Sequence, residues 1–164
     1  MLHLKSASLS DIPLIHALAA KTWANTYGEI LSPEQLEWMF HRMYSHDSLR
    51  RQITEGQQFF IAYRNETPYG YISIEREGSH LFHFQKIYVI PEGQGKGIGA
   101  ALVEKGIAYV RSIQPEPCRI ELNVNRANKA LHFYRKMGFE IDREGDFPIG
   151  NGYFMNDYIM KLEL

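Results

Sequence analysis

A run of alternating glycines from Gly93 to Gly99 constrains this chain more than any other feature. The apolar segment before it, Ile87 to Ile90, has the β-branched and aromatic composition of a buried strand. Pro91 ends that strand, because proline has no N–H to give to a ladder. Apolar residues at helical spacing follow from Val103 to Val110. The predicted order is therefore strand, glycine-rich turn, helix.

Such a turn is suited to binding a phosphate. Its backbone N–H groups converge on a helix N-terminus, where the dipole favours negative charge, and glycine leaves room for close approach. The spacing does not fit the dinucleotide fingerprint G-x-G-x-x-G. It does not fit the nucleotide-hydrolase loop either, because Lys96 is followed by Gly97 and not by Ser or Thr. An ordinary glycine-rich turn is the alternative to a pyrophosphate site.

A second informative segment is Asn128-x-Ala130-x-x-Phe133-Tyr134-x-x-x-Gly138-Phe139. By its spacing it is an amphipathic helix that ends at a glycine, with basic residues near its negative end. Residues 125–137 are predicted to form this helix. We expect its apolar side to pack into the core.

Together the two segments resemble the GNAT superfamily of N-acetyltransferases. Gln94-x-x-Gly97-x-Gly99 directly after a strand is similar to the acetyl-coenzyme A loop of that superfamily, and the segment from Asn128 to Phe139 is similar to its second coenzyme motif. Short runs elsewhere resemble the polyamine-acetylating branch, the spermidine and spermine acetyltransferases of the PaiA kind. These runs are Trp23-x-x-Thr26-Tyr27, Ser32-Pro33-Glu34 and Asp157-Tyr158-Ile159-Met160.

The expected fold class is α/β (α+β): one GNAT-like domain over residues 1–164, with a mixed central sheet of about seven strands and helices on both faces. Residues 58–63 and 68–75 read as a hairpin. A strand starts at residues 139–143, a loop is predicted over 144–152, and the last strand over 154–162. With 45% hydrophobic residues, the chain is able to form a substantial core.

The composition also limits the partners and the compartment. A formal net charge of −1 gives no field that would favour nucleic acid or an acidic membrane. Histidines lack a metal-ligand spacing, and the single Cys118 excludes an internal disulfide and suits a reducing compartment. We expect a cytoplasmic protein without a bound metal, a monomer or a homodimer, whose partner is a small-molecule amine acceptor.

The resemblance implies acetyl-CoA as cosubstrate, with CoA as product. The main chain of the glycine-rich turn would hold the pyrophosphate; the residues are Gln94, Gly95, Lys96, Gly97, Ile98, Gly99 and Ala100. Lys96 would add a charge or would simply be solvated. The peptide-like pantetheine arm can pair with a strand edge, so Ile87 and Val89 are its expected main-chain partners. The Val89 N–H would also hold the oxyanion, and Asn128 would bind the arm.

Family resemblance assigns Tyr134 as the general acid for the departing thiolate; its alternative role is packing. The base is open. Relatives often carry a glutamate on the strand before the turn, whereas this chain offers His83 and Gln85 on one face of that strand. Glutamine cannot act as a base, and His83 can. A water relayed to Glu29 or Asp157 is the other route.

The leading hypothesis is transfer of an acetyl group to a primary amine, such as a polyamine or another small amine. The alternatives are a peptide or protein N-acetyltransferase, or a catalytically weak acetyl-CoA-binding sensor. We expect an acceptor cavity beside the Ile87–Val89 strand edge. Its predicted residues are the aromatic Trp23, Tyr27, Tyr153 and Phe154, the acidic Glu29 and Asp157, and Gln85.

Overall fold

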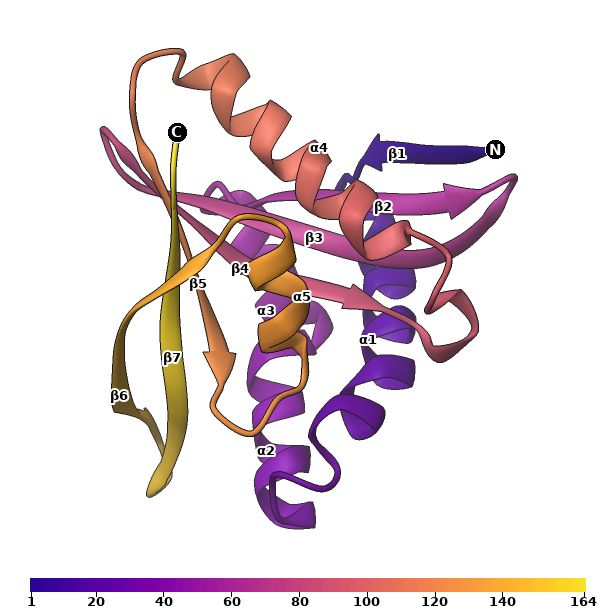
Figure 1. The fold of residues 1–164 in the computed structure, drawn as a ribbon. Coiled ribbons are helices and arrows are strands. Elements are labelled where there is room, and N and C mark those ends of the chain that lie inside the picture. The colour runs from indigo at the N-terminus through magenta and orange to yellow at the C-terminus, as the bar shows by residue number, and fades with distance from the viewer.

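One seven-stranded sheet runs through the molecule in the order β1-β2-β3-β4-β5-β7-β6 (Figure 1). The computed structural model describes all 164 residues. The strands are β1 (Leu2–Ser6), β2 (Gln58–Arg64), β3 (Thr67–Gly78), β4 (Leu81–Val89), β5 (Arg119–Asn125), β6 (Glu140–Gly150) and β7 (Tyr153–Glu163). The helices are α1 (Ile12–Tyr27), α2 (Pro33–Tyr44), α3 (His46–Thr54), α4 (Ile98–Ile113) and α5 (Ala130–Lys136), with short 3-10 turns at Leu9–Asp11 and Pro91–Gly93.

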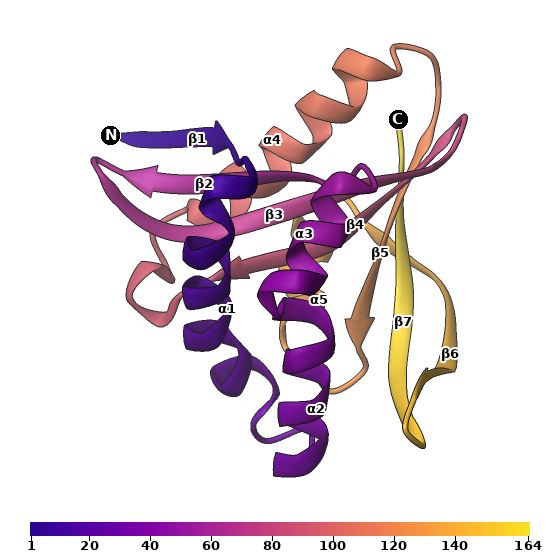
Figure 2. The ribbon, with the colours of Figure 1, turned by 180° about the vertical axis from the view of Figure 1, so that it is seen from behind.

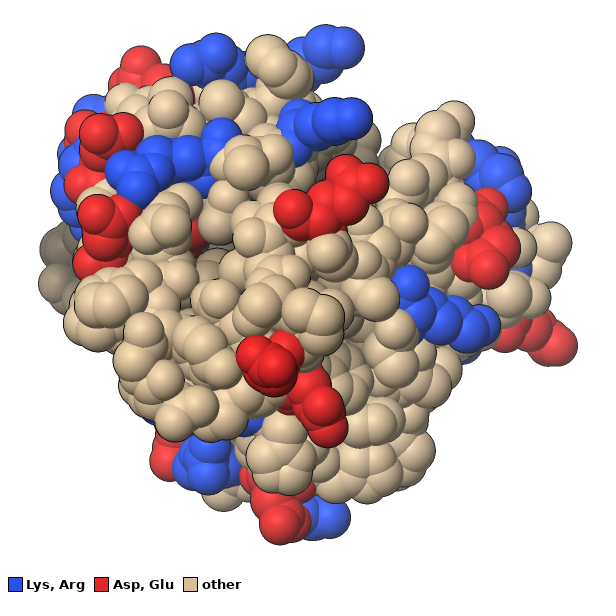
Figure 3. Space-filling view, turned by 90° about the horizontal axis from the view of Figure 1, so that it is seen from below, with Lys and Arg blue, Asp and Glu red and all other residues tan.

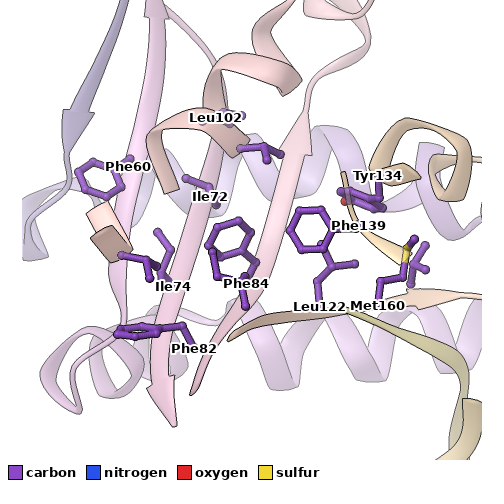
Figure 4. Packing of buried hydrophobic residues seen from close by; sticks show 14 of the residues in the cluster. Phe60, Ile72, Ile74, Phe82, Phe84, Leu102, Leu122, Tyr134, Phe139 and Met160 are labelled. Carbon is purple, nitrogen blue, oxygen red and sulfur yellow. The ribbon is translucent and has the colours of Figure 1, made fainter. Parts of the chain in front are cut away.

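Helices cover both faces of the sheet, as expected for this fold class. Helices α1, α2 and α3 lie on one face and α4 and α5 on the other, which Figures 1 and 2 show from opposite sides. Each face has its own apolar cluster. The cluster under α4 and α5 contains Phe84, Leu102 and Leu122 (Figure 4), and the cluster under α1 to α3 contains Trp23 and Tyr71.

The sheet opens between its two central strands. All neighbours pair antiparallel except β4 and β5, which are parallel and are joined by a crossover through α4. Their pairing covers only Leu81 to Phe84 against Arg119 to Leu122. Beyond Phe84, β4 therefore has no strand partner on its β5 side.

Strand β4 has a β-bulge against β3 at the point where it begins to separate from β5. Ser73 of β3 pairs with Lys86 and Ile74 pairs with Phe84, so Gln85 has no partner. A bulge bends its strand and increases the local twist. Bend and opening occur at the same place, and this leaves room between β4 and β5.

The helix starts follow local capping chemistry. At α2, the Ser32 hydroxyl accepts a hydrogen bond from the Gln35 N–H over 3.2 Å, and Pro33 occupies the first helical position. Helix α4 begins after Gly97, whose φ of 77° is left-handed and suits glycine. The glycine-rich turn thus delivers the chain directly into a helix.

The predicted loop over residues 144–152 is wrong, because most of this segment is strand. Strand β6 continues to Gly150 and pairs with β7 as far as Tyr153. Pro148 is tolerated because β6 is an edge strand. The turn is only Asn151-Gly152, both at positive φ, which is the Asn-Gly signal of a two-residue hairpin.

The predicted helix over residues 125–137 is shortened to Ala130–Lys136. Two asparagine side chains hold the preceding residues in turns. The Asn125 Oδ1 accepts from the Ala127 N–H and the Asn128 Oδ1 from the Ala130 N–H, each over 2.9 Å. Such side-chain bonds compete with helix formation.

None of the helices has the length and apolar composition that crossing a bilayer requires.

Candidate active site

A cavity of about 700 Å³ lies where β4 and β5 separate. This volume is within the usual range for small-molecule sites. One half is walled by the glycine-rich turn, the start of α4 and α5. The other half is walled by the end of α1, the β4 bulge and β5. The acidic and basic residues on its wall are Glu29 and Lys129.

The glycine-rich turn leaves its backbone open toward the cavity. The N–H groups of Gly95, Lys96 and Gly97 have no backbone acceptor, and the first α4 N–H with a helical partner is that of Ala101, bonded to the Gly97 carbonyl. An added Cβ at Gly95 or Gly97 would meet no protein atom within 4 Å. Unpaired N–H groups, open space and a helix N-terminus together fit a phosphate group.

Gly99 has a different role from Gly97. A Cβ at this position would lie 3.3 Å from the Phe133 ring of α5. The small residue therefore lets α5 approach the first turn of α4. This contact brings the two sequence segments of the predicted coenzyme site to one cavity.

The free edge of β4 faces the cavity through Ile87 and Val89. The Ile90 N–H donates to the Tyr69 carbonyl of β3 over 2.8 Å. Because backbone groups alternate in direction along a strand, the N–H groups of Ile87 and Val89 point to the opposite, unpaired side. An extended chain with its own amides can pair with this edge.

Tyr134 lies on α5 with its ring in the core and its side chain on the cavity wall. It is 9% exposed and packs against Phe139 with ring centroids 6.3 Å apart (Figure 4). Burial is the largest cause that raises the pKa of the Tyr134 phenol far above its usual value, followed by the charge of Tyr27. The hydroxyl therefore keeps its proton at neutral pH and is available as a donor.

The acceptor half contains a second tyrosine, Tyr27, at the end of α1. Its hydroxyl lies 2.9 Å from that of Tyr88 on β4. Trp23 is not on the cavity wall: it is 4% exposed, donates from Nε1 to the Leu36 carbonyl and packs behind Tyr27 with ring centroids 4.7 Å apart. Trp23 thus supports the wall instead of forming it.

Most residues predicted for the site do converge on the cavity. They are Tyr27, Glu29, Gln85, Ile87, Val89, Gln94, Gly95, Gly97, Ile98, Gly99, Ala100, Asn128 and Tyr134. Six predicted residues are not on its wall: Trp23, His83, Lys96, Tyr153, Phe154 and Asp157.

The structure does not bring His83 to the cavity, which corrects its expected position. It lies where β4 and β5 still pair, opposite Glu121, and its Nδ1 is 3.4 Å from Glu77 Oε1. The opening begins only after Phe84. Strand alternation placed His83 and Gln85 on one face but could not show where the two strands separate.

Three further residues lie elsewhere than expected. Tyr153 packs on Trp38 of α2 with ring centroids 5.5 Å apart, and Phe154 is 50% exposed at the β6–β7 hairpin. Lys96 places its Nζ 5.7 Å from the Tyr69 ring centroid. The segment predicted as a loop is a hairpin, which places Tyr153 on α2 and leaves Phe154 half exposed, so neither ring is on the cavity wall.

The wall residues that the sequence reasoning did not name include Tyr88 and Asn123. Asn123 is exposed in the cavity and donates from Nδ2 to Asp157 Oδ2 over 3.2 Å. Asp157 itself is only 3% exposed and lies behind that wall. The polar residue within the otherwise apolar β5 pattern was the signal that could have identified Asn123.

Sequence comparisons find related proteins along nearly the whole chain. The sequence model of the acetyltransferase (GNAT) domain matches residues 29–160. An uncharacterized N-acetyltransferase of Mycobacterium tuberculosis is 27% identical over 158 residues, covering 95% of this chain and 99% of that protein. A spermidine N(1)-acetyltransferase of Thermoplasma acidophilum is 27% identical over 160 residues, covering 93% and 98%.

A solved structure shares the fold along the whole chain. The PaiA N-acetyltransferase of Thermoplasma acidophilum, crystallised in complex with coenzyme A, superposes with a TM-score of 0.83. The two sequences are 24% identical, and the match covers 100% of this chain and 99% of that one. The sheet with helices on both faces is therefore a fold that an N-acetyltransferase is known to adopt.

Proposed function

The chain belongs to the GNAT acetyltransferase family and is an acetyl-CoA-dependent N-acetyltransferase, and from this premise we propose that its acceptor is a small cationic primary amine of the polyamine class. One observation carries the proposal. A single cavity joins the glycine-rich turn to an acceptor half whose only fully charged wall residue is the carboxylate of Glu29. The wall's one cation, Lys129, lies beside Asn128 at the coenzyme end.

The coenzyme end binds through main-chain groups. The free N–H groups of Gly95 to Gly97 hold the pyrophosphate, and the β4 edge at Ile87 and Val89 pairs with the amides of the pantetheine arm. The Oδ1 of Asn128 is occupied by the Ala130 N–H, so its Nδ2 is the group that donates to the arm. These contacts set the thioester beside Val89.

Two donors act on the thioester. The Val89 N–H is directed at the carbonyl oxygen, where negative charge develops as the amine attacks. The Tyr134 hydroxyl, protonated at neutral pH, donates its proton to the departing sulfur. The acetyl thioester supplies the acyl group, and the acceptor amine supplies the electron pair.

The acceptor half suits a cation with an aliphatic chain. Tyr27 and Tyr88 give it aromatic surface, and Glu29 gives it negative charge. Figure 3, seen from below, shows acidic side chains across the middle of this face and several Lys and Arg side chains toward its upper left. The similarity to a spermidine N(1)-acetyltransferase over nearly the whole chain supports the same substrate class.

The test measures thiol release from acetyl-CoA with a panel of amines: spermidine, diamines, monoamines, amino acids and peptides with a free N-terminal amine. We expect the highest kcat/KM with spermidine or a diamine. Glu29→Gln should raise KM for these polycations about tenfold, and much less for a monoamine, because one charge pair is lost. Glu37→Gln, an exposed α2 carboxylate away from the cavity wall, is the matched control for the change in net charge. A clear preference for peptides would overturn the proposal.

A further inference from the structure

Asp157 is a buried carboxylate with an unsatisfied oxygen. The residue is 3% exposed, and its Oδ1 has no hydrogen-bond partner. Only its Oδ2 is bonded, to the Nδ2 of Asn123 over 3.2 Å. Burying a carboxylate with so few partners costs free energy, so the position calls for a reason other than packing.

The Asp157 carboxylate is separated from the acceptor half of the cavity by the Asn123 side chain. Asn125 of β5 pairs with Asp157 of β7, so Asn123 and Asp157 are diagonal neighbours on the same sheet face. Asn123 is exposed and on the cavity wall. Tyr27, on the opposite wall, is close enough for the Asp157 charge to help raise the pKa of its phenol, after burial. The carboxylate therefore lies directly behind the Asn123 side chain that borders the cavity.

The surroundings of Asp157 favour proton uptake. Burial raises the pKa of its carboxyl, more than the Asn123 hydrogen bond and the charge of Arg126 lower it. Arg126 is itself paired with Asp146 and Glu144. From α1, the facing titratable group is Tyr27. Arg126 is thus the cation that opposes proton uptake by Asp157, and its charge is shared with Asp146 and Glu144.

We propose that Asp157, oriented by Asn123, accepts through one water the proton that the acceptor ammonium must lose before it attacks the thioester. This inference rests on the proposed function, because it needs an amine acceptor. The ammonium N–H bond breaks, the proton passes to an Asp157 oxygen and then to solvent, and the nitrogen keeps the electron pair that forms the C–N bond. After attack the second N–H proton passes to water, the C–S bond breaks, the sulfur takes the Tyr134 proton, and the Tyr134 phenolate regains a proton from solvent.

The first experiment is the pH dependence of kcat/KM with the best amine of the panel. Asp157→Asn keeps the size and shape of the side chain but removes its ability to accept a proton, and it should lower kcat by about 10²-fold. It should also remove the acid limb, meaning the extra inflection that the Asp157 carboxyl adds to the profile, and leave a residual rate that rises smoothly with the fraction of free amine. Acetyl-CoA affinity, measured by calorimetry, should change less than twofold. An unchanged kcat and limb would overturn the proposal, and so would a loss confined to KM, which would make Asp157 an ammonium-docking group.

Two more variants separate proton transfer from structure. Asn123→Ala removes a hydrogen bond that favours the ionised carboxylate, so the acid limb should move to higher pH. The exchange Asn123→Asp with Asp157→Asn keeps one carboxylate and one amide but puts the carboxylate on the cavity wall. It should recover at least tenfold of the lost kcat and regain an acid limb. A double variant as slow as Asp157→Asn, without a limb, would contradict the assignment.

A third measurement needs no acceptor, which distinguishes failure of this inference from failure of the proposed function. The titration of the Asp157 carboxyl is followed by ¹³C chemical shifts, with Asp157→Asn giving the assignment. We expect a midpoint above the ordinary value of about 3.9 and a proton in exchange with solvent. A carboxyl that stays ionised to pH 3 would overturn the inference, even if no amine in the panel is acetylated.

Discussion

The hydroxyl oxygens of Tyr27 and Tyr88 lie 2.9 Å apart and join the end of α1 to the free edge of β4. Tyr88 directly precedes Val89, and its ring lies 5.8 Å from that of Tyr71. Tyr71 in turn donates to the Tyr44 hydroxyl over 2.9 Å. Burial raises the pKa of Tyr27, and of Tyr88 well above its usual value, so both phenols keep their protons. A chain of phenols thus fixes the acceptor wall against the sheet.

We therefore predict strong coupling between Tyr27 and Tyr88. Tyr27→Phe should lower the free energy of unfolding by about 1–3 kcal/mol, because the Tyr88 hydroxyl loses its partner. The double variant Tyr27→Phe/Tyr88→Phe should cost clearly less than the sum of the single variants. Denaturant unfolding gives the three values. Additive values within about 0.5 kcal/mol would mean that the contact contributes little.

The second prediction concerns the glycine-rich turn. Gly97→Ala should weaken acetyl-CoA binding at least tenfold, about 1.4 kcal/mol, because the new methyl group projects into the open space proposed for the pyrophosphate. Calorimetry measures the affinity. Gly56→Ala is the matched control: Gly56 also has a positive φ with nothing within 4 Å, but it follows α3, away from the cavity. It should lose stability and keep its affinity, and an equal loss of affinity in both variants would argue against the proposed pyrophosphate site.

The order of secondary-structure elements and the residues of the coenzyme half of the site could largely be predicted from short sequence patterns. Glycine spacing and apolar periodicities depend on neighbouring residues, and they predicted the strand, the turn and the helix that follows it. The hairpin at Asn151-Gly152 was misread because Pro148 and the nearby glycines suggested a loop. Its Asn-Gly turn signal was present and should have outweighed them.

The acceptor half was harder to predict because it depends on tertiary geometry. The position at which β4 and β5 part decides that Gln85 reaches the cavity and His83 does not. No local pattern specifies where a parallel pair stops. The contact between Asn123 and Asp157 joins residues 34 positions apart and appears only when β5 and β7 pair. Sequence supplied Asp157 as a candidate, while its burial behind Asn123 required the structure.

The third prediction tests Tyr134 as proton donor. Tyr134→Phe should lower kcat and leave acetyl-CoA affinity nearly unchanged, because the lost interaction forms mainly in the transition state. Steady-state kinetics and calorimetry separate the two effects. Tyr109→Phe, a partly buried tyrosine of α4 that packs on Phe60 and is not on the cavity wall, is the control and should keep the wild-type kcat. If Tyr134→Phe turns over within about twofold of wild type, Tyr134 is a packing residue.

The last prediction uses a buried lysine on the β4 bulge. Lys86 is 4% exposed, donates from Nζ to Gln52 Oε1 over 2.6 Å, and lies over the rings of Tyr44 and Phe59. Burial lowers the pKa of Lys86 to about 8, against a smaller opposing effect of Glu75. In the unfolded chain the pKa is about 10.4. The folded state therefore binds this proton less tightly than the unfolded state.

The sign of the pH effect follows from that difference. Below pH 8 the lysine is charged in both states, and its burial costs about 3 kcal/mol of unfolding free energy. As pH rises from about 8 to 10.4, the folded state loses the proton first and the cost disappears. Lys86→Met removes the titrating group while keeping a long side chain. The unfolding free energy of wild type minus that of the variant should therefore rise by about 3 kcal/mol between pH 7 and pH 11. Taking this difference cancels the titration of all other groups, and parallel pH curves for the two proteins would show that the lysine is not desolvated in solution.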